Sequence, residues 1–155
     1  MTNINCTLFK NFTVREVGIA QEGLRRLDLA INDPQFQQSI RESKFNGTKD
    51  TGEIVLARIL SGADTLDEKK DYKIDLECVM YYSWWSKVVG YVTSGKRQIN
   101  TNRKFFGNPN NFASNVIHEY THLCGYGHQS ARDYGSVPYK INSLFELWCD
   151  KNNFK

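Results

Sequence analysis

The feature that most constrains this chain is the placement of its histidines, because all three fall within one short segment. His118 and His122 are four residues apart, and His128 follows six residues later. Residues four apart on a helix share one face, so two imidazoles in these positions can hold one metal ion. Gly125 lies between the second and third histidines. Glycine tolerates positive φ, so a sharp turn there can bring His128 back to the same ion.

Glu119 directly follows the first histidine, where its carboxylate can reach a water molecule on the same ion. Zinc lowers the pKa of such a water, and a neighbouring glutamate can accept the proton as the water attacks a carbonyl group. A closed structural zinc site needs no carboxylate in that position. The HExxH pattern therefore indicates hydrolytic chemistry with zinc (Zn2+) as the cofactor and Glu119 as the general base.

The complete string from His118 to His128 reads HExxHxxGxxH, and it resembles the signature of the metzincin clan of zinc peptidases. Five fixed positions arise by chance on the order of once in twenty thousand chains of this length, whereas HExxH alone is a weak signal. The resemblance covers the motif and, loosely, the order of elements before it. It implies a compact zincin-like domain with zinc metalloendopeptidase activity on a peptide or protein substrate.

One element of the metzincin pattern is missing. The family has a methionine in a turn beneath the zinc, C-terminal to the third histidine, but both methionines of this chain precede the motif. The segment 135–139 (GSVPY) occupies that place, and its glycine and proline favour a turn. Val137 or Pro138 would then supply the apolar floor of the site. The resemblance implies that Tyr139 ligates zinc or donates to the oxyanion, and a tyrosine that simply packs is an equal interpretation.

A rival third ligand lies further along the chain. Glu146 and Asp150 read ExxxD on an expected C-terminal helix. In thermolysin-like zincins, the glutamate of this pattern is the third ligand and the aspartate orients a histidine, a support with a clear physical role. An acidic pair four residues apart is more often a solvated helix face. His128 is therefore the preferred third ligand.

Hydrophobic periodicity predicts several helices. Thr13 and Glu16 form a capping box, and an apolar stripe continues to Ile31, where residues 32–34 end the helix. Residues 35–44 are ambiguous, with a short strand over residues 36–40 as one interpretation. The other expected helices are residues 54–60, capped by Asp50 or Thr51 and ended by Gly62; residues 112–124, capped by Asn110 or Asn111; and residues 141–152.

Three strands are expected between the second and third helices. Residues 74–85 are rich in apolar and aromatic side chains, and residues 88–93 and 97–105 flank a turn at Ser94-Gly95. The order of elements predicts an α+β fold, in which a small, mostly antiparallel or mixed sheet packs on helices that include the HExxH helix.

The aromatic and basic residues of this region have structural interpretations. Trp84 and Trp85, with the two tyrosines before them, are expected to pack in the core and the sheet. The metzincin resemblance implies an edge strand that binds extended substrate by strand addition, and residues 97–105 would supply it. The basic residues around that strand are expected to guard its free edge; they are Lys96, Arg97, Arg103 and Lys104.

Composition fits one globular domain over residues 1–155. A net charge of +3 is too small to indicate a nucleic-acid or membrane partner. No apolar run approaches the roughly 20 residues of a membrane span, and residues 1–10 lack the pattern of a signal peptide, so a cytoplasmic protein is expected. The four cysteines fit buried free thiols as well as disulfides.

Two other functional classes stay open at this point. A binding module derived from a zincin fold would keep the zinc and lack catalysis, which would account for the missing methionine turn. A structural α+β protein would carry the histidines on a helix surface and bind no metal. Peptide hydrolysis with Glu119→Ala as the control separates the enzyme from the binding module, and metal analysis separates both from the structural protein.

Overall fold

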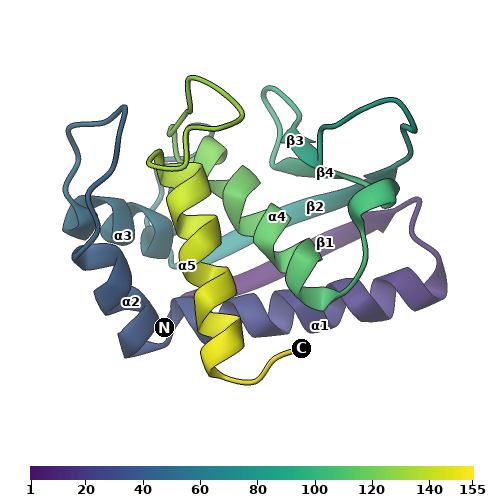
Figure 1. Cartoon of the computed structure of the whole chain (residues 1–155), viewed down its shortest axis with the longest axis horizontal. Coiled ribbons are helices and arrows are strands. Elements are labelled where there is room, and N and C mark those ends of the chain that lie inside the picture. Colours follow the sequence, from purple (N-terminus) through teal and green to yellow (C-terminus); the bar gives the residue numbers. More distant parts are fainter.

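The computed structural model describes residues 1–155 and contains five α-helices and one four-stranded sheet (Figure 1). The strands are β1 (Asn3–Lys10), β2 (Lys73–Tyr81), β3 (Gly90–Val92) and β4 (Gln98–Asn102). The helices are α1 (Val14–Ile31), α2 (Pro34–Arg41), α3 (Gly52–Ser61), α4 (Pro109–Leu123) and α5 (Val137–Lys151). None of these helices has both the length and the apolar character that a membrane crossing requires. All four cysteines are free thiols.

The sheet is mixed, which confirms the predicted α+β class. Its order is β1-β2-β4-β3, with β1, β2 and β4 parallel and β3 antiparallel to β4. Along β2 the residues alternate between buried and accessible positions, so only one face of the sheet is covered. Figure 1 shows α4 and α5 crossing in front of β1 and β2. The core therefore lies between one sheet face and the helices.

The N-terminal strand β1 was not predicted from the sequence. It pairs in parallel with β2, and the register shifts between Cys6 and Leu8. Ile4 and Cys6 are half-buried, Leu8 is exposed and Phe9 is half-buried again. This irregularity changes the phase of the apolar positions, so the period-two signal of a strand is broken within eight residues.

The predicted ends of two helices are confirmed. The Thr13 hydroxyl accepts from the backbone N–H of Glu16, and the Glu16 carboxylate accepts from the backbone N–H of Thr13. Thr51 caps α3 through the backbone N–H of Ile54. Gly62 ends α3 with a φ of 75°, the left-handed conformation that glycine adopts without strain.

Residues 34–41 form helix α2, so the interpretation of residues 36–40 as a strand is wrong. The Asp33 carboxylate accepts from the backbone N–H groups of Gln35 and Phe36, and Pro34 occupies the first turn. Phe36 and Ile40, one turn apart, are both buried. The Asp-Pro pair that ends α1 therefore also begins α2, because proline lacks a backbone N–H and is tolerated in the first turn of a helix.

Strand β2 ends at Tyr81, so the predicted extension to residue 85 is wrong. Trp84 and Trp85 lie in a loop with 63% and 91% of their surfaces exposed, and they do not pack in the core as expected. Pairing of β2 with β4 stops at Tyr81 and Asn102. Without a partner strand beyond this point, the aromatic residues have no sheet to join.

The predicted edge strand is also wrong. β4 lies between β2 and β3, so neither of its edges is free, and a short 3-10 turn follows it at Arg103–Phe105. Arg97 pairs with Asp64 at 2.6 Å, and Arg103 pairs with Glu16 at 2.7 Å, so these arginines do not guard an edge. The edge strand beside α4 is β3.

Helices α4 and α5 both begin earlier than predicted. Asn108, not Asn110 or Asn111, caps α4, and its side chain accepts from the backbone N–H of Asn111. The break predicted at residues 107–109 is thus the start of the helix, with proline in its first turn. Ser136 precedes α5, so Tyr139 lies in the first turn of this helix rather than in a preceding loop.

Candidate metal centre

Three imidazoles converge at the C-terminal end of α4, as the sequence predicts. One ring nitrogen each from His118, His122 and His128 lies within 4.8 Å of the others. The ring centroids are 5.1 Å apart for His118 and His122, and 5.0 Å apart for His122 and His128. Transition metals such as zinc bind imidazole nitrogens at about 2.0–2.1 Å, so this cluster can hold a metal ion between its rings.

Gly125 makes the turn that returns His128 to the helix. It has a φ of 91°, and its backbone N–H donates to the His122 carbonyl at 2.9 Å. The N–H of Tyr126 donates to the Thr121 carbonyl at 3.1 Å. These two bonds form a Schellman motif, which satisfies the last carbonyls of the helix. The predicted role of Gly125 is confirmed.

A hydrogen bond fixes the orientation of His122. Its Nδ1 lies 2.7 Å from the carbonyl oxygen of Tyr126. A carbonyl only accepts, so Nδ1 carries the proton and Nε2 keeps its lone pair. Support of this kind sets the tautomer of a metal-binding histidine and holds its ring in place.

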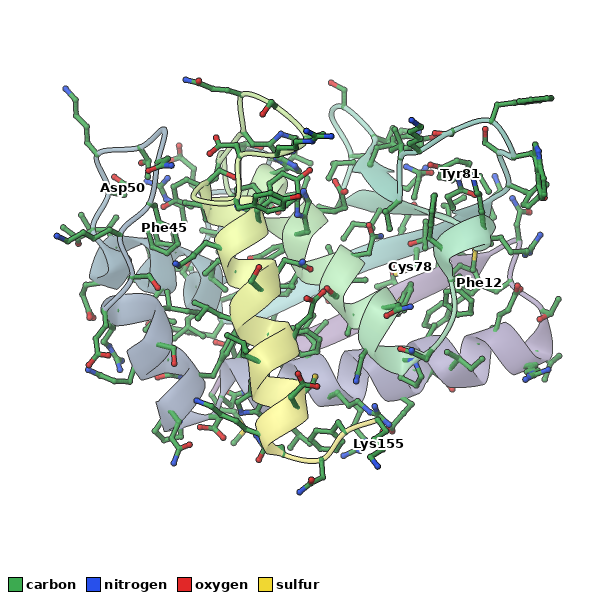
Figure 2. All side chains as sticks on the ribbon, viewed as in Figure 1. Phe12, Phe45, Asp50, Cys78, Tyr81 and Lys155 are labelled. Carbon is green, nitrogen blue, oxygen red and sulfur yellow. The ribbon has the colours of Figure 1, made fainter.

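Tyr126 is itself fixed by the region before and within α3. Its side chain is buried, and its hydroxyl donates to the Asp50 carboxylate at 2.8 Å. The Arg58 guanidinium lies 5.0 Å from the ring centroid and 3.3 Å from Asp50. Figure 2 labels Asp50 in the loop that leads into α3. Sequence reasoning missed this support, because Asp50 and Tyr126 are 76 residues apart.

Glu119 lies in the same cleft as the histidines, as predicted for a general base. Only 5% of its surface is exposed, and no side chain or backbone group forms a hydrogen bond with its carboxylate. Burial raises the pKa of Glu119 to about 7. A carboxylate without polar partners in a cleft can accept a proton from a reactant near neutral pH.

The surroundings of the histidines favour their neutral forms. Burial, and then the neighbouring imidazoles of His122 and His128, lower the pKa of His118 to about 4. The pKa of His122 is also lowered, chiefly by burial. Metals bind the neutral form of imidazole, so these groups are ready to act as ligands.

Tyr139 packs directly against the imidazoles. Its ring centroid lies 4.7 Å from that of His118 and 5.0 Å from that of His128. Burial raises the pKa of Tyr139 above the usual value, so its hydroxyl stays protonated and can donate a hydrogen bond. Val137 and Pro138, which precede it in α5, are both buried.

Glu146 lies outside the cluster of imidazole nitrogens. Its carboxylate accepts from the Ser114 hydroxyl at 2.7 Å and from the Asn142 amide at 3.3 Å. Ser114 precedes His118 by one helical turn of α4, so Glu146 lines another part of the same cleft. The three-histidine arrangement, rather than the thermolysin-like one, is the one that this structure assembles.

The cleft in front of these residues has a volume of about 840 Å³ and two unlike walls. One wall comes from α4, α5 and the segment between them, and it carries the imidazoles, two carboxylates and polar side chains. The other wall consists of residues 87–92 and Phe105 and is mostly apolar. Gly90 of β3 lies so close to Asn115 of α4 that a β-carbon at this position would collide with the amide. Strand β3 therefore borders the candidate metal centre.

Comparison with models of known protein families, with curated proteins and with solved structures finds no match to this chain.

Proposed function

We propose that this chain is a metzincin-like zinc metallopeptidase that hydrolyses peptide bonds in a peptide or protein substrate. The observation that supports it best is the placement of Glu119, buried and without a polar partner, in one cleft with three convergent imidazoles. Three histidine ligands leave one position of a tetrahedral site open, as in catalytic zinc sites. Bound there, zinc would supply Lewis acidity that polarises a carbonyl group and acidifies a water molecule.

The residues of the chain would then move the protons. Glu119 accepts a proton from the attacking water, whose oxygen bonds to the carbonyl carbon, and passes it to the leaving amine as the C–N bond breaks. Tyr139 is placed beside His118 and His128, where its hydroxyl can donate to the carbonyl oxygen as negative charge develops.

Strand β3 is the candidate for holding an extended substrate. It pairs with β4 on one side only, and its residues form the apolar wall of the cleft. A peptide that adds to the free edge of β3 would gain main-chain hydrogen bonds and lie along α4. This assigns to Gly90–Val92 the role that the sequence suggested for residues 97–105.

Metal analysis tests the ligand set. Elemental mass spectrometry of the zinc-loaded protein should find about one zinc per chain. His128→Ala should lose or loosen the metal, whereas Glu146→Ala should keep it, because Glu146 bonds to Ser114 and Asn142 rather than to an imidazole. Loss of zinc in Glu146→Ala with retention in His128→Ala would refute the three-histidine site.

Hydrolysis of a broad peptide library tests the catalytic roles. Glu119→Gln should keep zinc and lower the rate by about 10² to 10⁴-fold, the usual contribution of a general base. Tyr139→Phe should lower kcat by about 10²-fold with zinc and KM little changed, the effect of removing one oxyanion donor. Full activity of zinc-loaded Glu119→Gln would show that Glu119 is not the base.

The alternative is a zinc-binding module without catalysis, which the absence of the methionine turn favours. It predicts that the wild-type protein holds zinc and cleaves no member of the library. Cleavage that disappears in Glu119→Gln would exclude it.

A further inference from the structure

The loop between β2 and β3 (residues 82–89, here the aromatic loop) exposes a group of large apolar side chains. Single exposed apolar residues are normal on a protein surface, but a contiguous group marks an interaction site. Tyr91, the next large residue, extends the group onto β3. The large apolar residues exposed in this segment are Tyr82, Trp84, Trp85, Val88, Val89 and Tyr91.

The backbone of the aromatic loop is nevertheless held in place. The Asn102 amide donates to the carbonyls of Ser83 and Val88, at 3.2 and 3.3 Å. The Lys104 ammonium donates to the Trp84 carbonyl at 3.1 Å. Tyr81, labelled in Figure 2 at the end of β2, donates its hydroxyl to the Val88 carbonyl. The exposed aromatic side chains are therefore presented by a tethered loop.

The stretch of sequence that contains the aromatic loop carries only positively charged residues. Residues 78–118 contain five Lys and Arg and no Asp or Glu, which gives +5, while the rest of the chain amounts to −2. Arg97 and Arg103 are paired with carboxylates from other segments. Lys87 and Lys104 have no carboxylate within salt-bridge distance, and both are exposed. The whole chain has a net charge of only +3, but residues 78–118 (here the basic region), which contain the aromatic loop, carry +5.

The shape of the aromatic loop favours a lipid membrane over a protein helix or strand as its partner. Trp85 is the most exposed of its large residues, so it protrudes instead of lying in a groove that could receive a helix or strand. Figure 1 shows the loop standing beyond the sheet, at the same end of the molecule as the turn after α4. Protruding tryptophans flanked by lysines suit the interface of a lipid bilayer, where indole rings sit at the level of the headgroups.

We propose that the aromatic loop binds the surface of an anionic lipid membrane. Trp84 and Trp85 enter the boundary between headgroups and acyl chains, while Lys87 and Lys104 face anionic headgroups. Because Lys87, Val88 and Val89 also line the cleft, this attachment holds the mouth of the cleft close to the membrane. The proposal replaces the expectation from net charge that no membrane partner exists, and it does not depend on the zinc chemistry.

Vesicle flotation with the full-length protein tests the proposal. The wild type should bind phosphatidylcholine vesicles that contain phosphatidylglycerol more tightly than vesicles of phosphatidylcholine alone, with binding that weakens as salt rises. Trp84→Ala/Trp85→Ala should weaken binding at least about tenfold, and Lys87→Gln about fivefold. The matched controls Leu147→Ala and Lys49→Gln, exposed residues outside the basic region, should bind like the wild type.

Tryptophan fluorescence gives a second readout. Trp148 is buried between Phe145 and Phe154, so a blue shift on addition of anionic vesicles would come from Trp84 and Trp85 and should be absent in the double variant. Failure of the wild type to bind anionic vesicles, equal binding to neutral ones, or unchanged binding by the double variant would overturn the proposal. A soluble protein partner that needs Trp84 and Trp85, found without vesicle binding, would also overturn it.

Discussion

Two connecting segments border the cleft, and they are built in opposite ways. The segment between α4 and α5 (residues 124–136, here the His128 segment) is anchored near both ends by buried side chains: Tyr126 is buried and bonded to Asp50, and Ser136 is buried in a bridge with Asn46, whereas Tyr134 is exposed. The aromatic loop is tethered by its backbone, and its large side chains, including Trp85, face outward.

The difference agrees with the role proposed for each segment. A third metal ligand functions only when its ring is positioned within a fraction of an ångström, and burial of the neighbouring side chains provides that restraint. A binding surface must leave its apolar groups accessible until the partner arrives. Changes in the His128 segment should therefore alter metal binding and stability together, whereas changes in the aromatic loop should alter neither.

Removal of the metal should give the largest effect. Zinc present at a thousand times its Kd stabilises the folded state by about 4 kcal/mol, which corresponds to roughly 8 to 16 °C in Tm for a chain of this size. Calorimetry with and without a chelator should show this difference in the wild type and in Glu146→Ala, but not in His128→Ala. An identical Tm for the wild type with and without the chelator would mean that no metal bound at His128 stabilises the folded protein.

Loss of the Tyr126 hydroxyl should have the next largest effect. Tyr126→Phe removes the bond to Asp50 and should lower the free energy of unfolding by about 1–2 kcal/mol. Since the Tyr126 carbonyl orients His122, zinc affinity should also fall by about tenfold. Tyr82→Phe in the aromatic loop is the control.

Urea denaturation of the metal-free protein measures the free energy of unfolding, and competition with a chromophoric chelator measures the zinc affinity. Equal effects of the two substitutions would remove the proposed distinction between the segments. A loss of stability in Tyr126→Phe without any change in zinc affinity would separate the role of Tyr126 in packing from its role in positioning His122.

Two glycines of the His128 segment allow the contribution of backbone conformation to stability to be measured separately. Gly125→Ala places a β-carbon at a φ of 91° and should destabilise the protein by about 1–2 kcal/mol, the price of the left-handed conformation for an L-residue. Gly127→Ala lies two residues away, at a position without positive φ and with open space around it, and should change stability by less than about 0.5 kcal/mol. Urea midpoints of both variants provide the comparison, and similar losses would argue against a strained turn.

The placements that the sequence predicted and the structure confirms are those whose geometry is local. His118, Glu119 and His122 are placed by the period of one helix, and Gly125 and His128 by the turn that follows it. Hydrogen bonds within a few residues likewise define the caps of α1 and α3. Such features need no knowledge of the rest of the chain.

The features that escaped prediction depend on partners far away in the sequence. β1 is recognisable only beside β2, about seventy residues later in the chain, because its irregular register breaks the alternation of apolar positions. Trp84 and Trp85 belong to an aromatic run typical of a buried strand. Their exposure follows from the end of β4 at Asn102, which leaves β2 without a partner beyond Tyr81.

The smallest effect on stability is expected when the two exposed tryptophans of the aromatic loop are removed. Trp84→Ala/Trp85→Ala removes two indole rings that are exposed to solvent, so the free energy of unfolding should stay within about 0.5 kcal/mol of the wild type, with zinc affinity unchanged. Trp148→Ala is the matched contrast: its ring is buried and its Nε1 donates to Asp33 at 3.0 Å, and its loss should cost about 3–5 kcal/mol. If urea denaturation instead shows a loss of several kcal/mol in the double variant, the aromatic loop is part of the folded core in solution. Its exposed residues would then have a structural role, and the contrast with the His128 segment would fail.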